Sequence, residues 1–542
     1  MNPVIASWRA PLALLLAALP WLNPLAAGPS PAVTPWLISM VCAILLWSLA
    51  RLRDAPPPLP RPLAVAALVL VVWAALAHGP ARPEVAMLAG GLALVLLAAG
   101  AARASALAPA LQAGLLAAAG LNALVGLLQY FGLAAAVAPL VNVARLGEAF
   151  GNLRQTNQFA TLCWMGAAVL VFGTLRLPGA GRIALLLLLG AASAASASRT
   201  ALLEAFALFV LCAVWPGADR RARLVLAAVA AAGYGLATWL LPTLLELATG
   251  VASDRTLWGR FDTGDACASR RLLWGNVLEL IARRPWAGWG WGELDFAHYA
   301  HLYGGPRFCD ILDHAHNLPL HIAVELGIPV ALLASAAVLA WIFRQRPWRE
   351  DAPLRQLAWA LLALLALHSL LEYPLWYGHF QLVLGITVGW LAPAPSAEPA
   401  PAPAIGGRRA LPVALVLLGA TAYAAWDYAR ISQIYVPPGQ RLAPWREDTL
   451  EHARRSWLFS GQARFAEVTL AQPTRAHAEW LYEQAQRALH YSPEPRVIER
   501  VIESAVMLGH DDEALLHLAR YRAAFPRDHA AWRQRQRRPL PP

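Results

Sequence analysis

The chain has 542 residues, of which 58% are hydrophobic and only 14% are charged, and its formal net charge at pH 7 is +11. Soluble domains contain roughly 25% charged residues. This composition therefore excludes a protein that hides its apolar side chains in one soluble core, and predicts an all-α polytopic membrane protein. The positive charge does not indicate a nucleic-acid partner, because the arginines lie mostly in short loops between apolar segments, where they determine topology.

Apolar runs of about 17 to 25 residues are long enough to cross a bilayer as helices. The first such run follows Arg9 and reaches small residues at 26–28, as in a signal peptide, but the many apolar runs after it favour an uncleaved first span. The runs at 182–198 and 200–215 allow either two short spans or one long hairpin. Counted as two, they bring the prediction to about thirteen transmembrane helices, at residues 10–27, 34–50, 62–78, 84–101, 107–131, 157–175, 182–198, 200–215, 221–241, 318–343, 354–371, 378–393 and 409–427.

The distribution of arginine orients these spans. With the N-terminus in the cytoplasm, the cytoplasmic loops are rich in arginine and the short outer loops are not, as the positive-inside rule requires. The cytoplasmic loops then contain Arg51, Arg53, Arg61, Arg103, Arg176, Arg182, Arg220, Arg221, Arg223, Arg344, Arg346, Arg349, Arg355, Arg408 and Arg409, and the short outer loops contain Arg82, Arg145, Arg154 and Arg199. We therefore expect the extracytoplasmic side to hold residues 132–156, 198–200, 242–317, 369–378 and a C-terminal module at 440–530.

The first polar motif, GNLRQTNQFAT at residues 151–161, lies where an outer loop enters a predicted span. Gln155, Asn157 and Gln158 are amides of the kind that hold sugar hydroxyls or phosphates, and Arg154 can pair with an anion. The alternative is a polar helix cap at the membrane interface.

The second motif, SASRTALLE, places Arg199 between two apolar segments. A cationic side chain deep in the membrane costs roughly 2.5–3.5 kcal/mol on insertion scales. A polar cavity holding a phosphate would offset that cost. The alternative is that Arg199 extends to the interface, where water solvates its charge.

The third motif spans residues 269–298. A stripe of apolar residues at helical spacing, too short to cross a membrane, predicts an amphipathic helix lying on the membrane surface and ending at Pro285. Arg270 and Arg271 lie at its N-terminal end, where backbone N–H groups also favour anions. The stripe consists of Leu273, Val277, Leu280 and Ile281.

The GWGWG segment that follows is not a nucleotide-binding loop, because no strand precedes it and no βαβ unit surrounds it. Its neighbourhood is rich in aromatic residues, which can act either as interfacial anchors or as faces for sugar rings. Cys267 and Cys309 lie in the same predicted outer loop, where either a disulfide or two free thiols is possible. The aromatic residues are Trp286, Trp289, Trp291, Phe296, Tyr299 and Tyr303.

The fourth motif, DHAHNLPLHIAVELG, starts at Asp313 and runs directly into a predicted span. His314 and His316 fit no familiar zinc spacing, so we do not predict a metal site. His316 is a candidate general base, because imidazole titrates near neutral pH. The alternative is a structural histidine that caps the next helix.

The fifth motif, HSLLEYPLWYGH at residues 368–379, contains a helix-breaking proline, and Glu372 and Tyr373 face the outer side. The Glu372 carboxylate could orient a base or balance the arginines, or the segment could be an ordinary interfacial loop. In the C-terminal module, helical patterns occur at 447–467, 474–490, 494–508 and 511–524, and the last two resemble a tetratricopeptide-type hairpin.

Taken together, these motifs resemble the bacterial O-antigen ligase and polymerase superfamily, and within it most of all the protein O-oligosaccharyltransferases that glycosylate pilins. The resemblance covers residues 110–440, and it is clearest in GNLRQTNQFATL, RRLLWGNVLELIARRPWAGWGWGELDFAHY, DHAHNLPLHIAVELGIP and LEYPLWYGHF. Ligases of this family carry His, then Asn, Ser or Gln, then nine residues and Gly, and His316, Asn317 and Gly327 fit that spacing. The resemblance implies a GT-C-like fold with N-terminal transmembrane helices at 1–110, a ligase-like catalytic core at 111–430 with the periplasmic loop 242–317, and the helical module at 440–530.

The resemblance also implies a mechanism at the periplasmic face of a bacterial inner membrane. The donor would be an oligosaccharide on undecaprenyl diphosphate, and the acceptor a serine or threonine of a pilin-like or other periplasmic protein, with no cofactor or metal. His316 would take the proton of the acceptor hydroxyl, with Glu372 as a second catalytic residue. Binding of the diphosphate and glycan falls to Arg199, Arg270, Arg271, Arg154, Gln155, Asn157, His314, Asn317, Trp289 and Trp291.

Three other functions are compatible with the sequence. An O-antigen ligase would use lipid A–core as acceptor, and an O-antigen polymerase would use another lipid-linked glycan. A transporter would show internal repeats and polar residues near the midplane of the membrane, whereas the polar motifs here gather on one predicted side.

Overall fold

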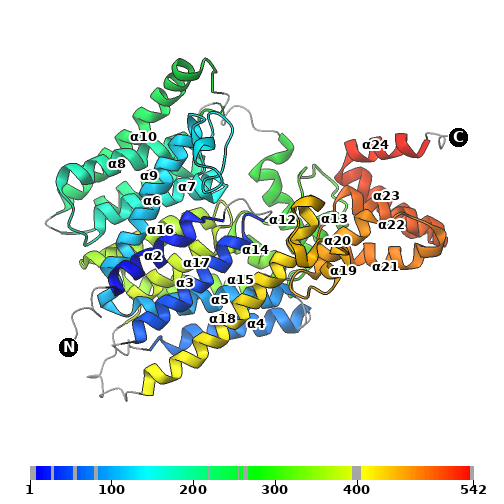
Figure 1. Cartoon of the computed structure of the whole chain (residues 1–542), viewed down its shortest axis with the longest axis horizontal. Helices are drawn as coiled ribbons and strands as arrows, with labels where there is room; N and C mark the ends of the chain where they lie inside the picture. Colours follow the sequence, from blue (N-terminus) through cyan, green and yellow to red (C-terminus); the bar gives the residue numbers. More distant parts are fainter. Residues whose placement is uncertain are drawn as a thin grey trace. The chain divides into compact units, whose positions relative to one another are not determined.

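In the computed structural model, every regular element among the described residues is a helix (Figure 1). The structure describes residues 8–25, 30–52, 58–78, 83–217, 219–253, 255–257, 259, 266–393 and 405–537. The small residues at 26–28 and the topology arginines Arg53 and Arg82 lie outside this part of the chain. The chain divides into two compact units, each built from separate segments: unit 1 contains 1–68, 89–263 and 339–422, and unit 2 contains 69–88, 264–338 and 423–542.

A helix begins within a few residues of the start of each predicted span. Unit 1 contains α2 (Arg9–Leu22), α3 (Val33–Arg51), α6 (Ala108–Tyr130), α7 (Thr156–Phe172), α8 (Gly179–Ala195), α9 (Arg199–Val214), α10 (Arg220–Thr249), α16 (Pro353–Ser369) and α17 (Gly378–Leu391). Four helices contribute residues to both units: α4 (Arg61–His78), α5 (Pro83–Ala102), α15 (Ile328–Gln345) and α18 (Ile405–Ser432). The region 182–215 forms two helices, α8 and α9. The predicted outer loop starts later than residue 242, because α10 continues to Thr249.

Six helices in the described part of the chain are long and apolar enough to cross a membrane: Val33–Arg51, Pro83–Ala102, Ser105–Tyr130, Arg220–Thr249, Ile328–Arg349 and Ala410–Tyr435. Several others, among them α2, α7, α8 and α17, are apolar but shorter. The chain is therefore a multi-pass membrane protein. The larger number of spans, and the orientation derived from the arginines, stay predictions.

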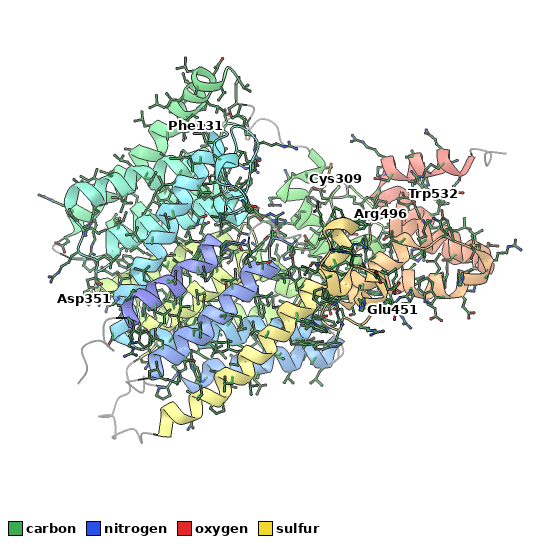
Figure 2. The ribbon with its side chains drawn as sticks, viewed as in Figure 1. Phe131, Cys309, Asp351, Glu451, Arg496 and Trp532 are labelled. Carbon is green, nitrogen blue, oxygen red and sulfur yellow. A yellow bond between two sulfur atoms is a disulfide. The ribbon has the colours of Figure 1, made fainter. Side chains whose placement is uncertain are left out.

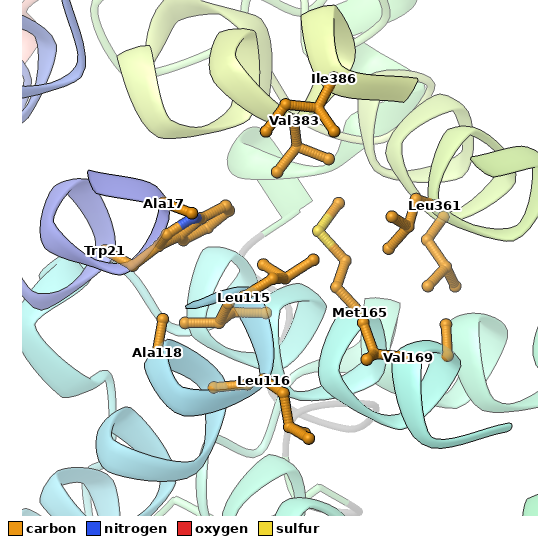
Figure 3. Packing of buried hydrophobic residues seen from close by; sticks show 14 of the residues in the cluster. Ala17, Trp21, Leu115, Leu116, Ala118, Met165, Val169, Leu361, Val383 and Ile386 are labelled. Atoms are coloured by element: carbon orange, nitrogen blue, oxygen red, sulfur yellow. The ribbon is translucent and has the colours of Figure 1, made fainter. Parts of the chain in front are cut away.

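Helix α7 is the centre of unit 1. It packs against α6, α8, α9, α10 and α16, and every residue from 158 to 172 is buried. A helix that is apolar all round needs protein or lipid around it, and here neighbouring helices surround α7. Figure 3 shows Met165 of α7 among side chains of the neighbouring helices, including Leu115 of α6, Leu361 of α16 and Val383 of α17. This packing fixes the N-terminal end of α7, where the motif 151–161 lies.

Helices α8 and α10 make the most extensive pairwise contact of unit 1, and Figure 1 shows them side by side. A glycine permits their close approach. A Cβ atom added at Gly190 of α8 would lie 2.5 Å from the carbonyl oxygen of Ala230 and 2.8 Å from the amide nitrogen of Tyr234, both on α10. By contrast, a Cβ added at Gly181 of the same helix would meet no atom within 4 Å.

The predicted span 318–343 is wrong as a single helix. It is two helices, α14 (Leu318–Leu326) and α15, separated at Gly327, whose φ of 94° is favourable only for glycine. The break is stabilised by the segment 285–290, which replaces the helical hydrogen bonds. The amide groups of Trp289 and Gly290 donate to the carbonyls of residues 324 and 325 at 2.9 and 3.0 Å, and Ile328 donates to the carbonyl of Pro285 at 2.8 Å.

The predicted amphipathic helix is present as α12 (Arg270–Arg283), but its apolar stripe does not lie on a membrane surface. Leu273, Val277 and Leu280 are completely buried in the core of unit 2. They pack there in one cluster with residues of α13 (Leu294–Ala300) and α14, and with Phe308 and Leu312. An amphipathic helix needs an apolar partner, and here the protein itself provides it. Tyr299 of α13 is likewise a core residue rather than an interfacial anchor, since it is only 1% exposed.

The C-terminal helices belong to the same compact unit as the loop 264–338, so the units cut across the predicted domain boundaries. The Tyr299 hydroxyl is 2.7 Å from Nδ1 of His517, and Nδ1 of His490 is 2.6 Å from a carboxylate oxygen of Glu293. Exposed charges such as Glu451 and Arg496 project from these helices (Figure 2). The helices are α19 (Thr449–Arg454), α20 (Ser460–Leu470), α21 (Ala478–Leu489), α22 (Pro495–Leu508), α23 (Asp511–Ala524) and α24 (Pro526–Arg537).

The first helix of this module differs from the sequence prediction. The helix expected at 447–467 is broken between α19 and α20, where Asp427 of α18 accepts hydrogen bonds from the Ser456 hydroxyl and the Leu458 amide at 2.9 and 3.3 Å. The hairpin of α22 and α23 forms as expected around Gly509, which has a φ of 74°. Pro526 then begins another helix, as proline is able to do in a first turn.

We expect Gly190→Ala to lower the midpoint of thermal unfolding of the detergent-solubilised protein, because overpacking a close helix contact costs roughly 1–3 kcal/mol. Gly181→Ala is the matched control on the same helix. It should be neutral or slightly stabilising, since alanine favours a helix by about 0.5–1 kcal/mol over glycine. Equal midpoints for the two variants would contradict the close approach of α8 and α10.

Candidate active site

The ends of three helices in unit 1 bring together three polar side chains, Asn157, Ser198 and Glu372, which we call the terminal layer. Asn157 lies in the first turn of α7, Ser198 precedes α9, and Glu372 follows α16. The Ser198 hydroxyl donates to the amide oxygen of Asn157 at 2.6 Å, and the Asn157 amide nitrogen donates to Glu372 at 3.2 Å. Ser198 and Glu372 are buried and Asn157 is half-buried. Three segments far apart in sequence therefore meet at one amide group.

A second set of polar side chains, Thr161, Glu204 and His368, lies further into the same three helices, and we call it the buried layer. The Thr161 oxygen is 2.5 Å from Oε1 of Glu204 and 2.9 Å from Nδ1 of His368. All three side chains are at most 1% exposed. Sequence analysis did not single out any of these three residues. The spacing contained a usable signal, because Thr161 follows Asn157 and His368 precedes Glu372 by four residues, one helical turn.

The loop that carries Arg154 is held by amide side chains of α6. Asn122 and Gln129 are buried and accept hydrogen bonds from the backbone of Asn152 at 2.9 Å and of Gly151 at 2.8 Å. Gly151 has a φ of 57°, and a Cβ there would lie 2.5 Å from Oδ1 of Asn122, so only glycine fits. Arg154, also left-handed with a φ of 59°, is exposed.

Gln155 was predicted to bind glycan, and the structure shows that it also has a local structural role. Its side-chain oxygen caps α7 by accepting from the Gln158 amide at 2.6 Å, which is the alternative that the sequence left open for this motif. Gln158 itself is buried, with its side-chain oxygen 3.2 Å from Nε2 of His379.

Three of the four predicted anion-binding arginines lie at helix starts. Arg199 is the first residue of α9 and is exposed. In unit 2, Arg270 and Arg271 are the first residues of α12; Arg270 is half-buried and Arg271 is exposed. Ser269 caps this helix, accepting from the Leu272 amide at 3.3 Å. Backbone N–H groups in a first turn carry partial positive charge, so each arginine adds to a field that already favours anions.

In unit 2, His316 has a left-handed backbone with a φ of 49°. For a residue other than glycine this conformation costs roughly 1–2 kcal/mol. The next helix is capped by Asn317, which accepts from the Leu320 amide at 3.1 Å. The cap oxygen of Asn317, predicted to bind substrate, is therefore engaged in holding the start of α14. His316 is half-buried, held in a strained conformation of the kind that functional sites often contain.

A second histidine, His321, contacts the loop that carries His316. Its Nδ1 accepts from the Ala315 amide at 3.4 Å, and its Nε2 lies 3.2 Å from Oε2 of Glu325. Since a backbone amide can only donate, the proton of the neutral imidazole is on Nε2, directed at Glu325. Glu325 also accepts from the Gly292 amide at 3.0 Å. The i, i+4 spacing of His321 and Glu325 could have identified this pair in the sequence.

His314, predicted to bind substrate, stacks on His321 with ring centroids 5.5 Å apart. Burial lowers its pKa below the ordinary value of histidine, although the hydrogen bond with the neighbouring Asp313 carboxylate opposes the shift. His314 therefore favours the neutral form near pH 7. Its stacked position makes it a packing partner of the loop that carries His316.

The two tryptophans predicted to face sugar rings have contacts of their own within unit 2. The indole N–H of Trp289 donates to the Leu280 carbonyl at 3.0 Å, and the Arg284 guanidinium lies 4.2 Å from its ring centroid, so Arg284 already covers one face of the indole. Trp291 approaches His321 edge to face at 6.0 Å. Trp286, by contrast, is 77% exposed.

Cys267 and Cys309 are joined by a disulfide, with their Cα atoms 5.4 Å apart; Cys309 is labelled in Figure 2. The other cysteines, Cys42, Cys163 and Cys212, are buried thiols. In the part of the chain that the structure describes, no group of three or more His, Cys, Asp or Glu residues is arranged to hold a metal ion.

His298 connects α13 to the segment that leads to this site. Its Nε2 donates to the Phe308 carbonyl at 3.2 Å, so Nδ1 accepts from the Tyr303 hydroxyl at 2.8 Å. Burial, reinforced by the positive charge of Arg307, lowers the pKa of His298 to about 3. The neutral imidazole is thus part of the scaffold on which the loop from 301 to 312 is built.

Comparison with known proteins shows which families parts of the chain resemble. Residues 149–172 match the family described as protein glycosylation ligase, residues 184–335 match O-antigen ligase, and residues 356–539 match the C-terminal part of the virulence factor membrane-bound polymerase family. The first of these matches covers Asn157 and Thr161, and the second covers Arg199, Arg270 and His316.

Two curated proteins of Acinetobacter baylyi are similar to parts of the chain. A general O-oligosaccharyltransferase is 27% identical over 117 residues, which are 22% of this chain and 20% of that protein. A ComP-specific O-oligosaccharyltransferase is 23% identical over 163 residues, which are 29% of each. The chain thus matches less than a third of the length of each of these relatives.

The helical fold is that of a multi-pass membrane protein, and the matched segments are similar to proteins named as ligases and O-oligosaccharyltransferases. Parts of the chain thus resemble the O-antigen ligase superfamily, and within it the protein O-oligosaccharyltransferases.

We expect the protein to become less stable as the pH decreases, because of the titration of His298. An unfolded histidine has a pKa near 6.5, above the folded value of about 3. The stability that depends on neutral His298 is therefore complete above pH 6.5 and is lost as the pH falls towards 3. His298→Gln keeps an N–H donor and an oxygen acceptor but does not titrate. Its unfolding midpoint should fall less steeply than that of the wild type between pH 7.5 and 4.5, and parallel curves would contradict this role.

Proposed function

We propose that the protein transfers an oligosaccharide en bloc from undecaprenyl diphosphate to serine or threonine hydroxyls of periplasmic proteins, with a pilin-like protein as acceptor. One observation supports this most directly. The segment similar to protein glycosylation ligases, 149–172, contains Asn157, the residue that links Ser198 and Glu372 in the terminal layer. The part of the chain that is most specific to protein glycosylation is thus also the part that assembles polar groups at the helix ends.

In the proposed reaction, the acceptor hydroxyl oxygen attacks the anomeric carbon of the first sugar. A new carbon–oxygen bond forms, the bond from that carbon to the diphosphate breaks, and the hydroxyl proton moves to His316. The electron pair of the broken bond leaves with the diphosphate, whose growing negative charge requires cations. Arg199, Arg270, Arg271 and Arg154 are the proposed cations, because three lie at helix starts and three are exposed to a ligand.

His316 fits the role of general base because its position is fixed while its surroundings remain polar. The left-handed backbone, the Asn317 cap and the layer formed by His314 and His321 restrict the loop. Glu372 would take part from the terminal layer, where it accepts a hydrogen bond from Asn157 and where its carboxylate could accept from a substrate hydroxyl or bind a cation.

A second candidate function is ligation of the glycan to lipid A–core. It is favoured by the match to O-antigen ligases over 184–335, which contains His316 and three of the proposed arginines. Polymerisation onto another lipid-linked glycan comes third, and is favoured by the match over 356–539. The chemistry of the donor is the same in all three reactions, so only the acceptor distinguishes them.

We expect His316→Ala to reduce transfer by roughly 100- to 10,000-fold, the usual contribution of a general base, without loss of the protein from the membrane. His477→Ala is the matched control, because His477 is an exposed histidine of the same unit and should transfer at the wild-type rate. The measurement is the fraction of glycosylated acceptor by mass spectrometry, with membrane content determined by immunoblot. Transfer retained in His316→Ala would reject the assignment of the base.

The acceptor class is tested by co-expressing the wild-type protein with a lipid-linked glycan pathway, a candidate pilin and lipid A–core. The proposed function predicts an increase in pilin mass by one complete glycan at a serine or threonine. Unmodified pilin together with glycan-capped lipid A–core would establish the ligase instead. Longer lipid-linked glycans, with both other acceptors unmodified, would establish the polymerase.

A further inference from the structure

The proposed reaction does not explain why the buried layer in unit 1 contains a carboxyl group. Glu204 is completely buried in α9, a helix whose other side chains are almost all apolar. An ionisable group inside a membrane helix is costly, and a carboxylate deprived of water is stable only beside a cation or several donors. Among the described residues Glu204 has no salt bridge, and its Oε2 atom has no hydrogen-bond partner.

The number of hydrogens needed for the hydrogen bonds of Thr161 indicates which of its neighbours are protonated. The Thr161 hydroxyl has one hydrogen, yet three groups lie within hydrogen-bond distance: the Asn157 carbonyl at 3.0 Å, Glu204 at 2.5 Å and Nδ1 of His368 at 2.9 Å. A carbonyl can only accept. All three contacts are satisfied together when Thr161 donates to the Asn157 carbonyl and receives one hydrogen from His368 and one from Glu204. The last of these requires a protonated carboxyl group.

The surroundings of Glu204 agree with a neutral group. The titratable side chains that interact with it from the neighbouring helices are Cys163 of α7 and Tyr234 of α10, and through Thr161 His368 of α16, beyond which lies Glu372. None of these is a fixed cation. A carboxylic acid leaves only one acceptor oxygen unsatisfied, which costs far less than an unpaired carboxylate.

We propose that Glu204 is a positioning residue, carried as a neutral carboxylic acid that donates to Thr161. Through this bond and the bond from Thr161 to His368, it holds α7, α9 and α16 in register, so that Asn157 lies between Ser198 and Glu372. The position of Arg199, which directly follows Ser198, is fixed by the same register. The inference rests on the proposed function for its effect on transfer, but not for the protonation of Glu204.

Glu204→Gln tests the proposal, because its amide N–H can replace the carboxyl O–H as donor to Thr161 but cannot ionise. We expect transfer by Glu204→Gln, and its dependence on pH, to lie within about twofold of the wild type, since the donor is retained. If Glu204 instead worked as an ionised base or as an ion-pair partner, Glu204→Gln would lose activity or one limb of the pH profile, and the proposal would be overturned.

Thr161→Val removes the central hydroxyl with little change of volume. We expect transfer to fall on the order of 10- to 100-fold, because small displacements of positioned groups have effects of this size. Thr387→Val is the matched control: Thr387 is equally buried, but its hydroxyl bonds only to carbonyls of its own helix, α17, at 3.0 and 2.8 Å. Equal activities of the two valine variants would contradict a positioning network.

A measurement independent of activity separates this inference from the proposed function. The infrared spectrum of the purified wild-type protein should contain the carbonyl stretch of a protonated carboxyl group that is missing in Glu204→Gln. If wild-type protein modifies no acceptor but this band is present, the function is wrong and the neutral Glu204 stands. If the band is missing from the wild-type protein, the neutral Glu204 is wrong, whatever the activity.

Discussion

The constraint on which this structure depends is that a polar group carried into the membrane by a helix must find a hydrogen-bond partner within the protein. Hydrocarbon offers no hydrogen bonds, so each unsatisfied donor or acceptor costs several kcal/mol. In unit 1 this constraint acts at Thr161, Glu204 and His368, which come from α7, α9 and α16 and meet at a single hydroxyl oxygen. Apolar packing around α7 would allow it to rotate or slide by small amounts, whereas these directional bonds allow one register only. The side chains of the terminal layer are positioned by the same register, because they lie at the ends of the same three helices.

The same requirement explains the spacing between His316 and Gly327. Asn317 caps α14 at its start, and Gly327 ends it after nine helical residues, where amide groups of residues 285–290 satisfy the backbone of the break. Irregular backbone at membrane depth is tolerated only where protein surrounds it. The fixed distance in the sequence is therefore the length of one short helix, held at both ends by hydrogen bonds. It fixes the separation along the chain between the strained His316 and the break at Gly327.

Sequence analysis predicted the helical segments well because each apolar run, and each polar boundary, is a local property of the chain. The prediction failed where a segment could pack against, or bond to, more than one kind of partner. The stripe of Leu273, Val277 and Leu280 is equally suited to lipid or to protein, and only the fold shows that Phe308 and Leu312 cover it. Likewise, the run 318–343 is continuous in hydropathy, but distant amide groups break it at Gly327. Asn157 and Glu372 were found as polar residues near predicted helix ends, whereas Glu204 was overlooked within an apolar segment, where a carboxyl group should have been the strongest signal.

The polar residues of unit 1 also follow a gradient of solvation. Arg154 and Arg199, which cannot lose their charge, are exposed at the loop and helix start that carry them. Asn157 and Glu372, at the helix ends, are half-buried or buried and pair with each other. Deeper still, Thr161, Glu204 and His368 can all exist without charge. Since the cost of a charge rises steeply with its distance from water, this order leaves the permanent charges at exposed positions and the interior to groups that can be uncharged.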